Sequence, residues 1–182
     1  MMRVTEILTL CGLREWPASV RHEDREWCLQ RGTMIHRACA VLNGGRTIDP
    51  ASLDERIAGY VEAYQKFRRE VGGLVLGYEK EVRCAALGYV GHYDVVIAKP
   101  ATCTRRAVLY DIKTNEADVV TRLQTAGYVY ALRGKGLRRG FVALHVDGTY
   151  KTEVYKDDTR DVATWLACCQ LAAWLKKNGK GG

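Results

Sequence analysis

Apolar side chains recur at helical spacing in the first part of the chain and at strand-like spacing in the middle. From His22 to Leu42, and from Asp49-Pro50 to Gly72-Gly73, the intervals are three and four residues, which predicts two helices. Apolar and β-branched runs follow, separated by short turn-forming segments, and these predict three strands. The predicted strands span residues 75–83, 89–97 and 107–113.

The rest of the chain returns to helical spacing, interrupted by one hairpin. We expect a helix over 118–133, two strands at 139–146 and 149–155 about Asp147-Gly148, and a final helix over 158–177. The element order is therefore ααβββαββα. This order predicts the α/β (α+β) class, with a mixed central β-sheet between helices, made of an antiparallel meander and further strands.

The length of 182 residues suits a single domain over 1–182, with a polar, glycine-rich tail at 176–182 that we expect to be disordered. Hydrophobic residues make up 47% of the chain, yet no apolar run approaches the ~20 residues of a membrane span. The start, MMRVTEILTL, lacks the apolar core of a signal peptide. We therefore expect a cytoplasmic protein.

Cysteine spacing and net charge narrow the chemistry further. The seven cysteines include no C-x-x-C pair, which predicts reduced core thiols rather than disulfides or a zinc site. The formal net charge of +7 favours a polyanionic partner such as DNA or RNA. The basic segment RGKGLRR offers candidate phosphate contacts, although a merely solvated loop fits it equally well. These candidates are Arg133, Lys135, Arg138 and Arg139.

Candidate catalytic residues begin at the end of the third predicted strand, in the stretch VLYDIKT. Alternate strand residues share a face, so Asp111 and Lys113 lie on the same side of the sheet. Symmetric pairing about the two predicted turns places Asp94 opposite Asp111, and Glu79 opposite Asp94. Three carboxylates would then form one row across three strands, provided that no β-bulge shifts the register.

Opposed carboxylates repel one another unless something neutralises them, and a divalent cation is the natural partner. Magnesium binds carboxylate and phosphate oxygens, and a lysine beside the metal-bound water would stabilise charge on the phosphate. The row therefore predicts a phosphodiester-cleaving site that uses one or two Mg²⁺ or Mn²⁺ ions. The plainer alternative is a solvated acid and lysine on the wet face of an edge strand.

Five short stretches resemble the PD-(D/E)xK nuclease superfamily, whose core carries acids and an Asp/Glu-x-Lys pair on adjacent strands. They are YEKEV, GYVGHYD, LYDIKT, the RGT-x-x-H motif at 31–36 and the Q-x-x-x-Y motif at 124–128. The two helical motifs resemble the RecB-like, lambda-exonuclease-like branch, and especially small phage-encoded exonucleases. The resemblance runs from residue 4 to about residue 133 and implies a restriction-endonuclease-like core.

The resemblance implies four catalytic side chains, which are Glu79, Asp94, Asp111 and Lys113. The three acids would also hold the metal ion, together with the backbone carbonyl of Ile112 and the side chain of His36. Gln124 and Tyr128, one helical turn apart, match residues that brace the site or contact the substrate. Asp111 stands where many relatives have the longer Glu.

Two neighbouring residues leave the first acid and the histidine open. Glu81 could replace Glu79, and His92 could replace His36, because both lie near the same row. The iron-sulfur cluster of CRISPR-associated relatives needs one early cysteine and a late group of three. Only Cys168-Cys169 stands near the end of this chain, so we expect no cluster.

The implied activity is that of a Mg²⁺- or Mn²⁺-dependent deoxyribonuclease, in the first place an exonuclease of phage or bacterial DNA recombination, repair or processing. Its partners would be double- or single-stranded DNA, further copies of the chain in a homo-oligomer, and a phage recombination partner such as a single-strand annealing protein, but no membrane. Two alternatives stay open: an endonuclease or junction resolvase of the same fold, and a non-catalytic DNA-binding module with a vestigial site. The complete set of acids and lysine favours the enzyme.

Overall fold

The computed structural model of the chain describes residues 1–15, 22–98, 107–114, 116–134, 136–156 and 159–179. The predicted turn 99–106 with Cys103, Lys135 and residues 180–182 of the expected tail lie outside this set. In chain order the described elements are β1 (Met2–Arg3), α1 (Val4–Leu10), α2 (His22–Asn43), the 3₁₀ turn η1 (Pro50–Ser52), α3 (Glu55–Val71), β2 (Leu74–Cys84), η2 (Ala85–Leu87), β3 (Tyr89–Ala98), β4 (Ala107–Thr114), α4 (Val120–Leu132), β5 (Arg138–Leu144), β6 (Tyr150–Val154) and α5 (Thr159–Lys177).

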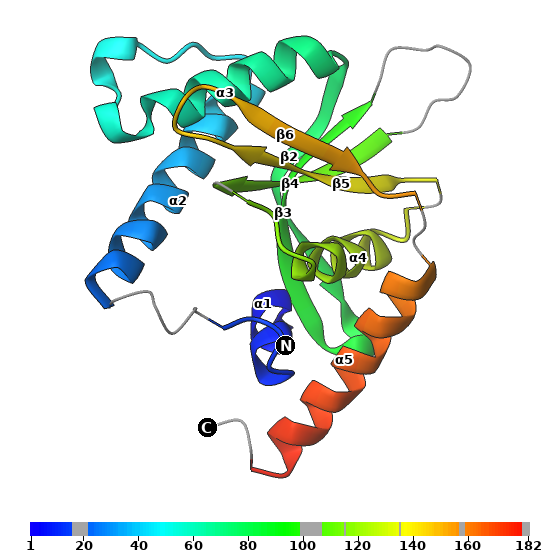
Figure 1. Cartoon of the computed structure of the whole chain (residues 1–182). Coiled ribbons are helices and arrows are strands. Elements are labelled where there is room, and N and C mark those ends of the chain that lie inside the picture. Colours follow the sequence, from blue (N-terminus) through cyan, green and yellow to red (C-terminus); the bar gives the residue numbers. More distant parts are fainter. Residues whose placement is uncertain (16–21, 99–106, 115, 135, 157–158, 180–182) are drawn as a thin grey trace.

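All the described strands belong to one mixed sheet (Figure 1). Its order is β1-β3-β4-β5-β6, and β2 pairs with the other side of β3. The β1–β3 and β4–β5 pairs are parallel, whereas the β2–β3–β4 meander and the β5–β6 hairpin are antiparallel. The expected α/β class, with a mixed sheet between helices, is confirmed.

Helices cover both faces of this sheet (Figure 1). Helices α2 and α3 bury Ile35 and Phe67 against one face, and α1, α4 and α5 form a second core around Trp165 on the other. Strand residues alternate between the two cores, so Tyr110 belongs to the first and Leu109 to the second.

The expected element order is confirmed between residues 22 and 177, and the structure adds β1 and α1 before it. Helix α1 buries Val4, Ile7 and Leu8, and at its start the Arg3 N–H donates to Glu6 Oε2 at 3.1 Å. A helix of 7 residues and a strand of 2 are too short for apolar spacing to predict them.

The predicted boundary of the C-terminal tail at residue 176 is wrong. Lys176 and Lys177 form the last turn of α5. Lys176 Nζ also lies 3.1 Å from Glu6 Oε1, which ties the end of α5 to α1. Cationic side chains in a last helical turn complement the helix dipole, so polarity alone did not mark the end of the element.

The predicted register between β3 and β4 is confirmed. Val95 pairs with Tyr110, and the ladder continues in that register to Ala98 and Ala107. Asp94 and Asp111 are the next residues on the two strands, at the point where the pairing of β3 with β4 stops. The two acids therefore lie at the mouth between β3 and β4, where the sheet opens.

The predicted register between β2 and β3 is also confirmed around the first acid. Tyr78 pairs with Val95 and Lys80 with Tyr93, so Glu79 falls opposite Asp94. The ladder does contain an irregularity, between Val75 and Gly77. Because it lies beyond the acids, it leaves them on one row.

The described cysteines agree with the expected reduced state. Cys11, Cys28, Cys39, Cys84, Cys168 and Cys169 are all free thiols. Among the helices of the described residues, none combines the length and the apolar character needed to cross a membrane.

Candidate active site

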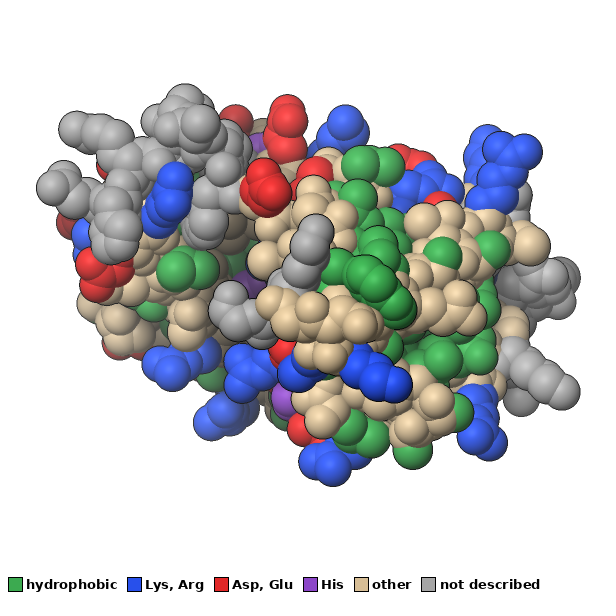
Figure 2. Space-filling view, turned by 90° about the horizontal axis from the view of Figure 1, so that it is seen from below, with side chains coloured by type: hydrophobic (Ala, Val, Ile, Leu, Met, Phe, Trp, Pro, Cys, Tyr) green, Lys and Arg blue, Asp and Glu red, His purple; other side chains and the backbone are tan. Residues whose placement is uncertain are grey.

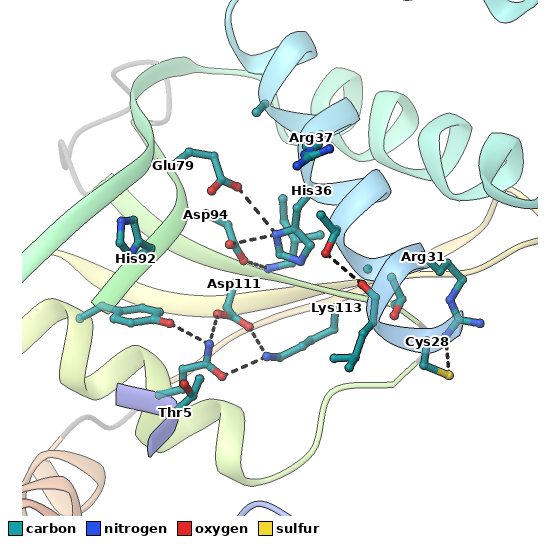
Figure 3. A pocket seen from close by; sticks show the side chains of 18 of the residues that line it. Thr5, Cys28, Arg31, His36, Arg37, Glu79, His92, Asp94, Asp111 and Lys113 are labelled. Atoms are coloured by element: carbon teal, nitrogen blue, oxygen red, sulfur yellow. Dashed lines mark hydrogen bonds and ion pairs between the residues drawn. The ribbon is translucent and has the colours of Figure 1, made fainter. Parts of the chain in front are cut away.

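A cavity of about 740 Å³ lies where β3 and β4 part, between α2 and α4 (Figure 3). The residues that the motifs predicted for catalysis and metal binding, and both residues of the Q-x-x-x-Y motif, line this one cavity. They are His36, Glu79, Asp94, Asp111, Ile112, Lys113, Gln124 and Tyr128. They come from α2, three neighbouring strands and α4, so the fold alone brings them together.

Asp94 uses its carboxylate to continue the hydrogen bonding where the β3–β4 ladder stops. The Ile112 N–H donates to Asp94 Oδ2 at 2.5 Å, and His36 Nδ1 lies 3.1 Å from Asp94 Oδ1. Burial raises the pKa of Asp94, but the positive charge of His36 and these hydrogen bonds outweigh burial, so the pKa is lowered. Asp94 is thus held as an anion between β4 and α2.

His36 reaches the acids from α2. Its Nδ1 lies 3.1 Å from Asp94 Oδ1 and 3.7 Å from Glu79 Oε1. Burial lowers the pKa of His36, but the charge of Asp94 and the hydrogen bonds to Asp94 and Glu79 outweigh burial, so the pKa lies well above its usual value. The acids around His36 therefore favour the protonated, positively charged imidazole.

Glu79 occupies an unusual backbone conformation, with φ at 45°. Residues other than glycine rarely adopt this left-handed region, and such conformations concentrate at functional sites because surrounding structure must hold them. At Glu79 the conformation interrupts the alternation of β2 and leaves the carboxylate beside His36 (Figure 3).

Asp111 and Lys113 form the other half of the site, and Gln124 joins them. Lys113 Nζ lies 2.8 Å from Asp111 Oδ2 and donates to Gln124 Oε1 at 3.0 Å. Gln124 Nε2 donates to Asp111 Oδ1 at 3.0 Å and to the Tyr128 hydroxyl at 2.8 Å. Burial raises the pKa of Asp111, the charge of Asp94 adds to this effect, and Lys113 opposes it.

The donor atoms fit a hard divalent cation. His36, Glu79 and Asp94 each offer a ligand atom, and these three atoms lie within 4.8 Å of one another. Asp111 Oδ2 is buried and lies 2.8 Å from Lys113 Nζ, so a cation between Asp94 and Asp111 would share this oxygen with the lysine. Carboxylates favour Mg²⁺ or Mn²⁺, and the imidazole favours the transition metal of the two.

The geometry favours Glu79 and His36 over the two alternatives. Glu81 forms an ion pair with Arg83 and does not line the cavity. His92 lies on the cavity rim, with 61% of its side chain exposed and its Nε2 3.9 Å from Glu81 Oε2. His92 is therefore close to the site but outside the cluster of donor atoms.

The basic segment predicted to contact phosphate does not reach this cavity. Arg139 is fully buried, where it binds Asp161 Oδ2 at 2.5 Å and the backbone oxygen of Arg122 at 2.6 Å, so its predicted role in DNA binding is wrong. Arg138 is half-buried at the far end of β5, and the exposed Arg133 caps the C-terminal end of α4. Lys135 lies outside the described residues.

Other arginines surround the cavity, and the sequence reading missed them as site residues. They are Arg14, Arg31 and Arg37. Arg31 is half-buried, with its guanidinium carbon 5.6 Å from the centre of the Tyr60 ring and its Nη2 donating to Cys28 Sγ at 3.8 Å. For Arg31 the available signal was its place in the RGT-x-x-H motif at 31–36.

Comparison with solved structures identifies the fold. A proposed exonuclease from Eubacterium rectale shares 11% identity with the chain, with a TM-score of 0.53 over 98% of this chain and 81% of that one. A phage-related exonuclease from Haemophilus somnus matches at 11% identity and a TM-score of 0.42, over 98% and 96% of the two chains. An alkaline exonuclease from Laribacter hongkongensis matches at 16% identity and a TM-score of 0.38, over 98% and 93%.

No protein-family model matches the chain, and no curated protein matches its sequence. At identities this low, a structural match shows a shared fold and nothing more. The chain therefore shares its fold with the Eubacterium rectale protein.

Proposed function

We propose that the protein is a metal-dependent DNA nuclease that hydrolyses phosphodiester bonds, and in the first place an exonuclease. The observation that carries this proposal is one cavity in which acids from three neighbouring strands meet His36 and Lys113. A fold shared with a proposed exonuclease supports it. A degenerate binding module would be expected to lack an acid or the lysine, and this chain has all of them.

Asp94, Asp111, Glu79, His36 and the Ile112 carbonyl would hold Mg²⁺ or Mn²⁺. The ligand atoms of His36, Glu79 and Asp94 lie within 4.8 Å of one another, and Asp111 and Ile112 line the same cavity. When bound there, the ion would supply a water of lowered pKa and a positive charge for the phosphate. The negative charge of the acids favours binding of the ion. Without the ion, the same charge favours the protonated form of His36, because it raises the pKa of the imidazole. A proton and the metal would thus compete for the ring nitrogen of His36.

Lys113 is held by two acceptors, Asp111 and Gln124, on the face of β4 where the phosphate would bind. Its ammonium group donates a hydrogen bond to the attacking water or to a non-bridging phosphate oxygen, where negative charge develops. Gln124 fixes the lysine because its amide nitrogen is already engaged by Asp111 and Tyr128, so only its oxygen faces Lys113. Gln124 is therefore a positioning residue.

The arginines around the cavity supply contacts for the DNA backbone. Arg14 and Arg37 are exposed, and Arg31 is half-buried beside them on α2. On the face that carries α1, basic and histidine side chains lie close to acidic ones along one edge (Figure 2). Phosphate contacts of this kind position DNA without reading its sequence, which suits a nuclease that degrades many sequences.

An exonuclease is distinguished from an endonuclease or junction resolvase by its need for an end. Wild-type protein is incubated with end-labelled linear duplex and with closed circular DNA, in Mg²⁺, in Mn²⁺ and in EDTA. The proposal predicts loss of the linear substrate in either metal, intact circles, and no reaction in EDTA. Cleaved circles would identify an endonuclease, and stable DNA under every condition would leave a binding module.

A further inference from the structure

A separate cavity, of about 740 Å³, lies between the end of β2, the end of α4 and the first turns of α5. We call it the α4–α5 cavity, and its apolar walls include Cys84, Ala85, Ala86, Val129, Ala131 and Val162. It shares no lining residue with the candidate active site, so the proposed reaction gives it no role. A space of this size accommodates a large aromatic side chain.

Helix α5 is apolar on two opposite faces. The face that carries Trp165 packs into the second core. On the outer face, exposed apolar side chains recur at intervals of three and four residues, where a helix at the surface of a globular protein normally carries polar ones. We call this row the outer stripe, and its members are Ala163, Ala167, Leu171 and Trp174.

The outer stripe exposes its largest members to an unusual degree. Trp174 is 58% exposed and Leu171 is 46% exposed. Figure 2 looks from the end at which α5 finishes, and it shows hydrophobic side chains gathered in one patch near the middle of that face. Contiguous apolar patches on a protein surface mark places where another surface docks.

The two halves of the outer stripe differ in size. Ala163 and Ala167 leave the first half shallow, beside the α4–α5 cavity that Val162 lines, whereas Leu171 and Trp174 project from the second half. A helix rises 1.5 Å per residue, so Val162 and Trp174 lie about 18 Å apart along α5. Two α5 helices packed antiparallel would therefore set the projecting half of each on the shallow half of the other.

We propose that two copies of the chain associate about a two-fold axis through α5, with Trp174 of each copy entering the α4–α5 cavity of the other. A pairing centred between Cys168 and Cys169 places Trp174 beside Ala163 of the second copy, and Leu171 next to its Ala167. One surface serves both copies, so the contact closes at two. This inference is independent of the proposed nuclease function.

A second copy fits this surface because the projecting ring and the cavity that receives it occur on the same helix, at the spacing that an antiparallel pair requires. An unrelated partner would need only one of the two. Burial of two indole rings favours association, since aromatic side chains dominate interface energies. Charge opposes it, because each chain carries +7 and Lys177 would lie near Arg160 of the second copy.

Sedimentation equilibrium at about 0.3 M salt, where the repulsion between the two chains is screened, measures the association. At about 50 µM, where weaker interfaces of standard size are formed, the wild type should have twice the mass of the 20.4 kDa chain. Trp174→Ala should raise the Kd of the dimer at least about 100-fold, because a buried tryptophan is a typical hot spot and the variant removes two.

Ala86→Glu attacks the same contact from the other side. Ala86 is exposed at the cavity, so a carboxylate there blocks entry of the ring without disturbing the core. This variant should also be monomeric. A mixture of Trp174→Ala with Ala86→Glu should dimerise about tenfold more tightly than either variant alone, because the mixed pair keeps one intact ring and one open cavity.

Leu74→Ala is the matched control, because Leu74 is 70% exposed on β2 and lines neither cavity. It should dimerise as the wild type does. The proposal is overturned by a wild-type protein that stays monomeric or forms trimers, by Trp174→Ala dimerising like the control, or by a mixture that associates no better than its two components. The last result would mean that Trp174 does not enter the cavity of a second copy.

Discussion

Gln124 Oε1 accepts a hydrogen bond from Lys113 Nζ at 3.0 Å, and this contact fixes the direction in which the lysine points. The amide cannot turn around, because its nitrogen donates to Asp111 Oδ1 and to the Tyr128 hydroxyl. Helix α4 thus sets the orientation of the Lys113 side chain at the end of β4. Gln124 and Tyr128 lie one helical turn apart, and this spacing lets the tyrosine hydroxyl accept the second hydrogen bond of the amide.

The Gln124 contact predicts a loss of turnover rather than of substrate binding. Gln124→Ala should lower kcat about 10- to 100-fold, the usual effect of removing a residue that orients a catalytic group, and should change KM little. Gln170→Ala, an exposed position on α5, serves as the control. Steady-state kinetics on labelled DNA give both constants, and an unchanged kcat would remove Gln124 from the account.

Removing Lys113 or neutralising Asp111 should abolish cleavage without unfolding the protein. We expect Lys113→Ala and Asp111→Asn each to lower kcat by at least about 10²-fold, because each removes charge that acts on the reacting phosphate. Lys151→Ala, at an exposed lysine on β6, should cleave as the wild type does. Circular dichroism checks the fold, and wild-type activity in either variant would contradict that residue's role.

Neighbouring arginines on β5 should differ sharply in their effect on stability. Arg139→Ala leaves the largely buried Asp161 short of one partner and should lower the free energy of unfolding by roughly 3 kcal/mol. Arg138→Ala, one residue earlier, should change it by less than about 0.5 kcal/mol. Urea unfolding measures both, and equal effects would show that the Arg139–Asp161 pair does not hold α4, β5 and α5 together.

Arg139 also shows where sequence reasoning stops. The segment RGKGLRR gives composition but not which face of β5 is covered, and alternation puts Arg139 under α4 and α5 while Arg138 points elsewhere. Burial of a charged side chain depends on a partner distant in sequence, here Asp161. The sequence alone therefore could not distinguish a buried arginine from exposed ones among the four basic residues of this segment.

The acidic row, in contrast, was predictable because local rules determine it. Antiparallel strands that pair symmetrically about their connection have a register that can be counted from the sequence, so Asp94 and Asp111 could be predicted to oppose one another. The contact of His36 with Asp94 needed the docking of α2 on the sheet, which spacing does not give. The family motif supplied that residue, and the motif's own arginine, Arg31, was left out.

The raised pKa of His36 predicts that metal binding releases a proton. Because the protonated imidazole is the favoured form in the metal-free site, a cation must displace that proton, and the affinity for Mn²⁺ should rise with pH until the pH passes the raised pKa. Because its pKa is raised in the folded protein, His36 adds to the free energy of unfolding of the metal-free protein at low pH. This contribution is lost as the pH rises through the raised pKa.

Isothermal titration of Mn²⁺ in buffers of different ionisation enthalpy measures the proton count. His36→Gln should bind Mn²⁺ with fewer protons released and a flatter dependence on pH. Equal proton release in the two proteins would mean that another group accounts for the competition.

The central claim is that Asp94 and Asp111 share one divalent ion, and the anomalous scattering of Mn²⁺ in crystals of the wild-type protein tests it most directly. The account predicts one or two peaks in the active-site cavity, at least one of them about 2.0–2.3 Å from a carboxylate oxygen of each aspartate, and no such peak in Asp94→Asn. A cavity without a peak at saturating Mn²⁺, or a peak that touches neither aspartate, would contradict it.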